Sequence, residues 1–209
     1  MPVTATWYPN GWMNFAAGNI DFDADTIKVA LLSSTAAYND TNQYWSDISA
    51  NEITGTGYTA GGEALVNKTV TTTDSSALAA WAASTAYAVG DVVRAVTDNG
   101  NVFRCVVAGT SGATEPTWVT TTFRETADNT VVWVQFGSAI IVLDADDVVW
   151  ANATITARYA AIYKDTGIAT TSPLIGWVDF GADQSASGGN FTIQWSPNGI
   201  LRSAAGSFT

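Results

Sequence analysis

Apolar and polar residues alternate with a period of two in several segments of the chain. The clearest case is Ile27, Val29 and Leu31, which alternate with Lys28 and Ala30. This spacing places the three aliphatic side chains on one face, as in a half-buried β-strand. The segment therefore predicts a strand with one face against a hydrophobic core.

Other segments have the same alternation or a short aliphatic run, and the longest predicted strand is residues 153–163. The further predicted strands are residues 64–73, 140–143, 148–150, 175–180 and 190–195. Residues 181–189 are rich in Gly and Ser and predict a turn-rich connection. Residues 12–17 allow only one or two helical turns. The pattern predicts an all-β protein, an antiparallel β-sandwich or jelly-roll-like fold.

Residues 33–63 interrupt this pattern with many Ser, Thr, Asn, Asp and Gly residues. The glycine-rich stretch 55–62 within it is not a phosphate-binding loop, because it lacks the Lys-Ser/Thr ending and no helix follows. We expect this stretch to be a flexible or partner-ordered loop in an interaction arm.

Residues 81–137 have the features of a small β module set inside the longer chain. Two apolar segments flank Asp98-Asn99-Gly100, which predicts a hairpin with a type I′ turn. The segments before and after the module predict neighbouring strands of one sandwich. We therefore expect residues 1–78 and 139–209 to form a discontinuous carrier domain, with residues 79–138 as an inserted β module.

The module has little aliphatic material, so aromatic side chains are expected to supply its core. Exposed tryptophans can instead stack on sugar rings, and Trp81 and Trp118 are the strongest candidates because they lie beside loops. Core packing is favoured over ligand stacking at any single position. The candidate carbohydrate-binding residues are Trp81, Tyr87, Phe103, Trp118 and Trp133.

The composition limits the classes of partner. Charged residues make up 13% of the 209 residues, against roughly 25% in an average globular protein, and such a surface suits packing into assemblies. The net charge of −11 repels phosphate backbones and anionic lipids. We therefore expect no nucleic-acid partner.

Cys105 is the only cysteine, which excludes an intramolecular disulfide. Its apolar flanks predict a small buried side chain.

Candidate chemistry is sparse. The chain has no histidine, which removes the commonest general base and zinc ligand. Aspartates cluster at residues 21–25 and 144–147, where a carboxylate pair or, at 21–25, a calcium site are alternatives. Because both clusters adjoin strands, turn formation is favoured. We expect no catalytic residue, no bound metal and no cofactor, so the protein is not predicted to be an enzyme.

The N-terminus lacks the basic patch and apolar run of a signal peptide, and no segment is long and apolar enough to cross a bilayer. We therefore expect a protein that is made in a cytoplasm and is not inserted into a membrane.

Two resemblances extend this interpretation. Residues 81–93, Phe103-Arg104-Cys105 and the loop 108–112 resemble the small carbohydrate-binding modules of chitinases and their relatives in phage structural proteins. The adjacent tryptophans that chitinase modules carry after the second strand are replaced here by residues 106–109. This resemblance implies a small β fold and a contact with glycans.

The carrier resembles a family of small tailed-phage virion proteins, in residues 25–32, 51–62, 156–159 and 191–195. The resemblance implies a virion structural protein, made in the host cytoplasm. We expect a capsid decoration or cement subunit that binds the major capsid protein or other virion proteins and forms a homo-oligomer. The alternative is a tail-associated adhesin that recognises host surface polysaccharide; a depolymerase using an aspartate pair is the least favoured option.

Overall fold

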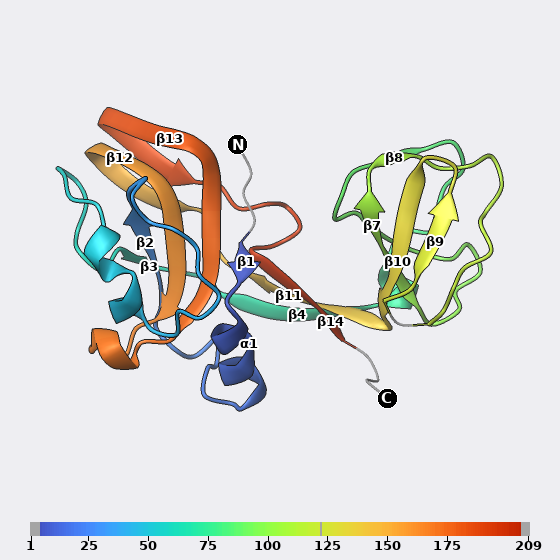
Figure 1. Cartoon of the computed structure of the whole chain (residues 1–209), viewed down its shortest axis with the longest axis horizontal. Coiled ribbons are helices and arrows are strands. Elements are labelled where there is room, and N and C mark those ends of the chain that lie inside the picture. Colours follow the sequence, from blue (N-terminus) through green and yellow to red (C-terminus); the bar gives the residue numbers. More distant parts are fainter. Residues whose placement is uncertain (1–4, 122, 206–209) are drawn as a thin grey trace. The chain divides into compact units, whose positions relative to one another are not determined.

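The computed structural model describes residues 5–121 and 123–205. Within them strands dominate and α1 (Pro9–Ala16) is the only α-helix (Figure 1). The strands are β1 (Thr6–Trp7), β2 (Ile27–Leu32), β3 (Glu63–Ala64), β4 (Thr69–Asp74), β5 (Ala86–Tyr87), β6 (Val92–Arg94), β7 (Val102–Val107), β8 (Gly109–Thr110), β9 (Glu125–Asp128), β10 (Val131–Gly137), β11 (Ala139–Asp144), β12 (Val148–Lys164), β13 (Leu174–Ile193) and β14 (Leu201–Ala205). The prediction of an all-β, antiparallel sandwich-type fold with a smaller β module is confirmed.

The chain divides into two compact units. The first comprises Met1–Val70 and Leu143–Leu201, and the second comprises Thr71–Val142 and Arg202–Thr209. An antiparallel sheet with the strand order β1-β13-β12-β2-β3 forms the first unit. The sheet β6-β7-β10-β9 and the pair β5-β8 lie in the second, together with most of a three-stranded sheet, β14-β11-β4.

Strand β2 is buried on both faces, so the prediction of a half-buried strand is wrong. The aliphatic side chains predicted to face the core are buried, but Ala30 and Leu32 on the opposite face are buried as well. These two residues share a core cluster with Trp45 and Ile48, which belong to the segment 33–63. The polar segment therefore covers the second face of the sheet, which the period-two pattern of β2 alone did not indicate.

Strand β13 is continuous over twenty residues, where the sequence predicted two strands joined by a turn-rich connection at residues 181–189. This connection is itself extended: Gln184, Ser185, Ala186 and Ser187 pair with β12. The register of the pairing shifts at either end of this run, and the glycines with positive φ lie at these shifts. The prediction of a turn is wrong, because Gly and Ser also form strands when a long partner strand supplies the hydrogen bonds.

The predicted strand 64–73 is divided into β3 and β4. Between them Asn67 adopts a left-handed backbone conformation with φ of 50°, and its side-chain amide donates to Asp146 Oδ2 at 2.6 Å. Asn accepts this conformation more readily than most residues. The segment therefore leaves one sheet and enters another within a few residues.

Strands β4 and β11 are neighbours in the three-stranded sheet, although residues 75–138 separate them in sequence. The Ser75 amide donates to the Ser138 carbonyl at 3.2 Å, so the chain departs and returns at the same point. The compact second unit is wider than residues 79–138, because it includes most of β4 and most of β11. The limits 79–138 for a separate domain stay a prediction.

The predicted hairpin between β6 and β7 is present, but its loop differs from the prediction. Pairing ends at Arg94 and Val102, which leaves a seven-residue loop in place of a two-residue turn. Of Asp98, Asn99 and Gly100, only Gly100 has a positive φ, 74°. Because a type I′ turn needs two such residues, the prediction of that turn type is wrong.

Candidate functional site

The predicted binding module is built around one aromatic core. Strands β6, β7, β9 and β10 form its sheet, and in β10 the side chains alternate strictly between buried and partly buried. The buried cluster consists of Trp81, Val93, Ala95, Phe103, Cys105, Val131 and Trp133, with Tyr87 and Trp118 packed against it. Large aromatic side chains therefore supply most of the apolar area in a sheet with few aliphatic residues.

A buried carboxylate links two tryptophan side chains of this core to a neighbouring loop. Asp128, 4% exposed, accepts hydrogen bonds at Oδ2 from Trp81 Nε1 at 2.7 Å and Trp133 Nε1 at 3.0 Å. Its Oδ1 accepts from the Gly112 amide at 2.7 Å. A buried carboxylate is tolerated only when donors satisfy its oxygens, and here two indoles and a backbone amide do so. Asp128 thereby fixes both tryptophan rings and the loop at residue 112.

Trp118 is the predicted binding residue whose ring is best placed to contact a ligand. It is partly exposed, and it stacks on Phe103 with ring centroids 4.0 Å apart and planes inclined by 25°. Its Nε1 donates to Glu115 Oε1 at 2.8 Å, and Glu115 is exposed. An indole held against the core with a carboxylate at its edge combines an apolar surface with an acceptor for hydroxyl groups.

The other predicted binding residues are more enclosed. Phe103 and Trp133 are completely buried and Trp81 is 7% exposed, so their rings serve as core in this conformation. Tyr87 is partly buried; its ring contacts Trp133 edge to face, and its hydroxyl accepts from the Ala82 amide at 2.9 Å. The five residues do gather in one cluster, but only Trp118 and Tyr87 retain partial exposure.

Sequence reasoning did not single out Asp128 or Glu115. Asp128 precedes Asn129, which has a positive φ of 54°, and an Asp-Asn pair after a strand indicates a turn. The alternation in β9 was the available signal, since Thr126 and Asp128 are its buried positions. Polar residues at inward positions of a short strand do not reveal which donors they meet.

Cys105 is completely buried, as predicted. Burial raises the pKa of its thiol, and the nearby Asp91 carboxylate raises it further. Its Sγ donates to the Val107 carbonyl at 3.2 Å. The thiol is therefore a small core group rather than a nucleophile.

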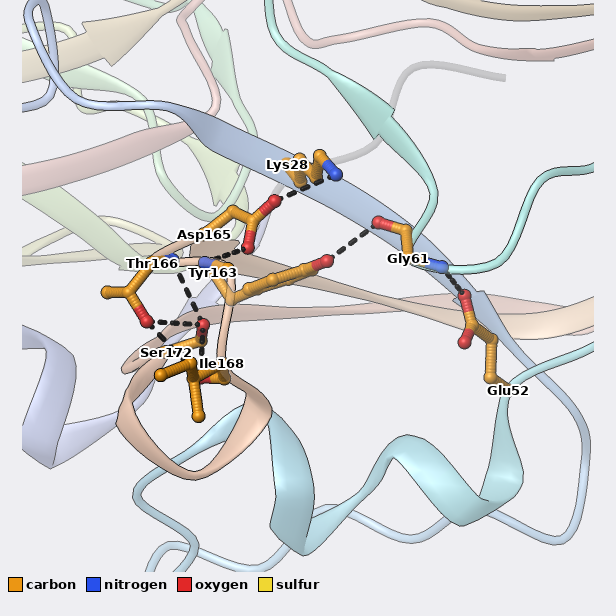
Figure 2. Close-up of polar contacts among 9 residues, drawn as sticks. Lys28, Glu52, Gly61, Tyr163, Asp165, Thr166, Ile168 and Ser172 are labelled. Carbon is orange, nitrogen blue, oxygen red and sulfur yellow. Dashed lines mark hydrogen bonds and ion pairs between the residues drawn. The ribbon is translucent and has the colours of Figure 1, made fainter.

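In the first unit, a polar network anchors the segment 33–63 (Figure 2). The Tyr163 hydroxyl donates to the Gly61 carbonyl at 2.7 Å, and the Gly61 amide donates to Glu52 Oε1 at 2.6 Å. Burial raises the pKa of Tyr163, whose ring stacks on Trp45 at 4.8 Å. The glycine-rich stretch is therefore held against the sheet by residues of the same chain, which differs from the expected flexible or partner-ordered loop.

The turn between β12 and β13 is held by an ion pair to β2 and by hydrogen bonds within the turn. Asp165 pairs with Lys28 at 2.8 Å, and the hydrogen bond from Lys28 lowers the pKa of this carboxyl. Ser172 donates to the Ile168 carbonyl at 2.9 Å and accepts from the Thr166 amide at 3.1 Å (Figure 2). These contacts close the turn. None of them places a general base beside a nucleophile.

A shallow cavity of about 210 Å³ lies next to this turn. It is lined by Asn14, Asn19, Tyr44, Lys164, Thr166, Thr171 and Pro173. The ammonium of Lys164 is already engaged by Asp25 Oδ2 at 2.8 Å and by the Asn19 carbonyl at 2.9 Å. The cavity therefore offers polar contacts but no free charge to orient a ligand.

The aspartates at 21–25 form a turn, whereas those at 144–147 accept hydrogen bonds from residues that are distant in sequence and do not form the predicted turn. Asp21 accepts from the Ala24 amide at 3.2 Å, and Asp25 accepts from the Asp21 amide at 2.8 Å. Asp147 accepts from the Trp195 amide at 2.8 Å. Within residues 5–121 and 123–205, no group of three or more metal-ligating side chains converges.

No helix in the described part of the chain has the length and hydrophobicity to cross a bilayer. Comparisons with known protein families, with curated proteins and with solved structures found no match to this chain.

Proposed function

We propose that this chain is a non-enzymatic structural protein of a tailed-phage virion, a decoration or cement subunit on the capsid. The β-sandwich carrier binds the major capsid protein or another virion protein, and the aromatic module is displayed. The observation that supports this most directly is the insertion between β4 and β11. Because these strands are neighbours, the chain can carry a large module there without interrupting the sheet.

The surface chemistry supports the same proposal. A chain with 13% charged residues presents mainly small polar and apolar groups, which pack closely against other subunits. The net charge of −11 disfavours contact with the packaged genome, so the attachment is to protein. The resemblance of the carrier to tailed-phage virion proteins leads to the same partner.

The proposal predicts the position of the protein in the particle. A density map of the phage that encodes this chain is expected to contain it on the head, in a copy number that follows the capsid symmetry. Particles with an in-frame deletion of the gene are the control, and the assigned density must disappear from their map. Absence of the chain from purified particles would contradict the virion function altogether.

The second candidate is a tail-associated adhesin, which the geometry of Trp118 and Glu115 favours. In this case the purified chain binds host polysaccharide on a glycan array, and Trp118→Ala weakens binding about tenfold, which corresponds to about 1.4 kcal/mol. The matched control is Trp12→Ala, because Trp12 is 40% exposed and lies in α1 of the first unit.

Circular dichroism must show that both variants remain folded. An adhesin also requires a few copies at the tail in the density map, whereas a decoration subunit requires many on the head. If the wild-type chain binds no glycan on the array, the adhesin is excluded and the decoration role is unaffected.

A further inference from the structure

Strand β13 has an edge without a partner strand. Its inner edge pairs with β12 along its length, whereas its outer edge pairs with β1 only at Gly176 and Trp177. Within the described residues, no strand lies on the outer edge from Val178 to Ile193. An open edge presents a row of backbone N–H and C=O groups that can pair with another strand.

Charged residues and proline, two of the usual protections of an edge strand, are absent from this part of the edge. Residues 184–192 contain no charged residue and no proline, and the same holds for residues 149–156 of the paired strand β12. Natural edge strands are commonly blocked by lysine, proline or bulges. Here irregular pairing on both sides leaves Gln184–Ser187 as an uninterrupted, in-register run, and its side chains are exposed apart from the partly buried Ala186.

Charge indicates which partner fits. Two copies of a chain with a net charge of −11 repel each other, and this repulsion acts mainly between groups closer than the Debye length of about 8 Å. The run 184–192 brings no charge into that range. A charged partner strand would find no opposite charge along this run, so an uncharged strand fits it, and the same run of a second copy is such a strand.

The local sequence is also self-complementary. In an antiparallel pair whose two-fold axis passes at Ala186, Ala186 lies opposite its own counterpart, and Ser185 of one copy lies opposite Ser187 of the other. In the same register the nearest acidic residue, Asp183, lies opposite Gly189 of the second copy. Like charges therefore do not face each other, and one two-fold axis relates the two strands.

We propose that the outer edge of β13, at Gln184–Gly188, pairs antiparallel with the same segment of a second copy. The two five-stranded sheets then form one continuous sheet across the dimer axis. This pairing does not depend on the virion function proposed above, since it uses only the edge and its charge. It assigns the predicted homo-oligomer to a particular surface.

The test is the molar mass of the full chain in solution, measured by sedimentation velocity over a range of concentrations. Twice the mass of 21.9 kDa, about 44 kDa, is expected for the wild type at high concentration. The double variant Ser185→Glu/Ser187→Glu places like charges opposite each other and is expected to raise the dimer dissociation constant at least about tenfold. The double variant Ser185→Lys/Ser187→Glu places opposite charges there and is expected to restore the dimer.

The matched control is Ser34→Glu/Ala37→Glu, which adds two acidic residues at exposed positions outside the edge run 184–192 and must leave the dimer intact. A wild type that is monomeric at all concentrations overturns the proposal. So does a dimer that tolerates the Glu/Glu variant, or one that the control also dissociates. If the wild type is monomeric but the Glu/Glu variant no longer binds phage particles, the occupant of the edge is a virion protein and self-pairing is wrong.

Discussion

Replacement of Asp128 by alanine is expected to unfold the aromatic module, with a loss of about 3–5 kcal/mol in the free energy of unfolding. The substitution removes the acceptor for Trp81 Nε1, Trp133 Nε1 and the Gly112 amide. Trp133 is completely buried and Trp81 nearly so, which means that water cannot replace the carboxylate without opening the core. A hydrogen bond to a charged group contributes about 1.5–3 kcal/mol, and three are lost together.

Urea unfolding followed by near-ultraviolet circular dichroism measures this loss, because the signal depends on fixed aromatic rings. Asp128→Asn is expected to fall between wild type and Asp128→Ala, since one oxygen remains but the amide nitrogen cannot accept a hydrogen bond. The matched control is Asp98→Ala: Asp98 is exposed and accepts from the Gly100 amide. Its loss should stay below about 1 kcal/mol, and equal losses for Asp98→Ala and Asp128→Ala would contradict the role given to the buried carboxylate.

The sequence indicated the composition of the module core but not its polar centre. A short sheet with few aliphatic residues needs aromatic side chains for its core, so Trp81, Phe103 and Trp133 could be expected to be buried. The inward position of Asp128 depends on indole donors from residues 81 and 133, far apart in sequence. No local pattern encodes that convergence, because it exists only once β9 and β10 have paired.

The same distinction applies to the carrier. The alternation of β2 correctly indicated a strand, yet its second buried face depends on Trp45, which arrives from a polar segment. In β13, residues 181–189 have the composition of a loop. They form part of a strand only because they pair with β12, whose apolar alternation extends over a longer segment. Local composition thus identified elements with a strong apolar period and failed where a distant partner decides the conformation.

The glycine-rich stretch supplies a second large expected effect: Gly62→Ala should destabilise the first unit by about 3 kcal/mol or more. Gly62 has a φ of 71°, which costs an L-residue roughly 1–2 kcal/mol. In addition, a Cβ at this position would overlap the Val29 carbonyl oxygen and lie 2.6 Å from the Cα of Ala30. Relieving such overpacking typically costs a further 1–3 kcal/mol or so, and it must push the loop away from β2.

Gly18→Ala separates these two contributions, because Gly18 has nearly the same φ, 73°, but no atom lies within 4 Å of the place that an added methyl group would take. It is therefore expected to lose only the conformational part, about 1–2 kcal/mol. Hydrogen exchange provides the local readout: in Gly62→Ala the amide of Leu31, which donates to the Tyr58 hydroxyl at 3.0 Å, should lose protection as the loop detaches. If Gly62→Ala and Gly18→Ala are equally stable and Leu31 stays protected, the loop does not depend on close backbone approach at residue 62.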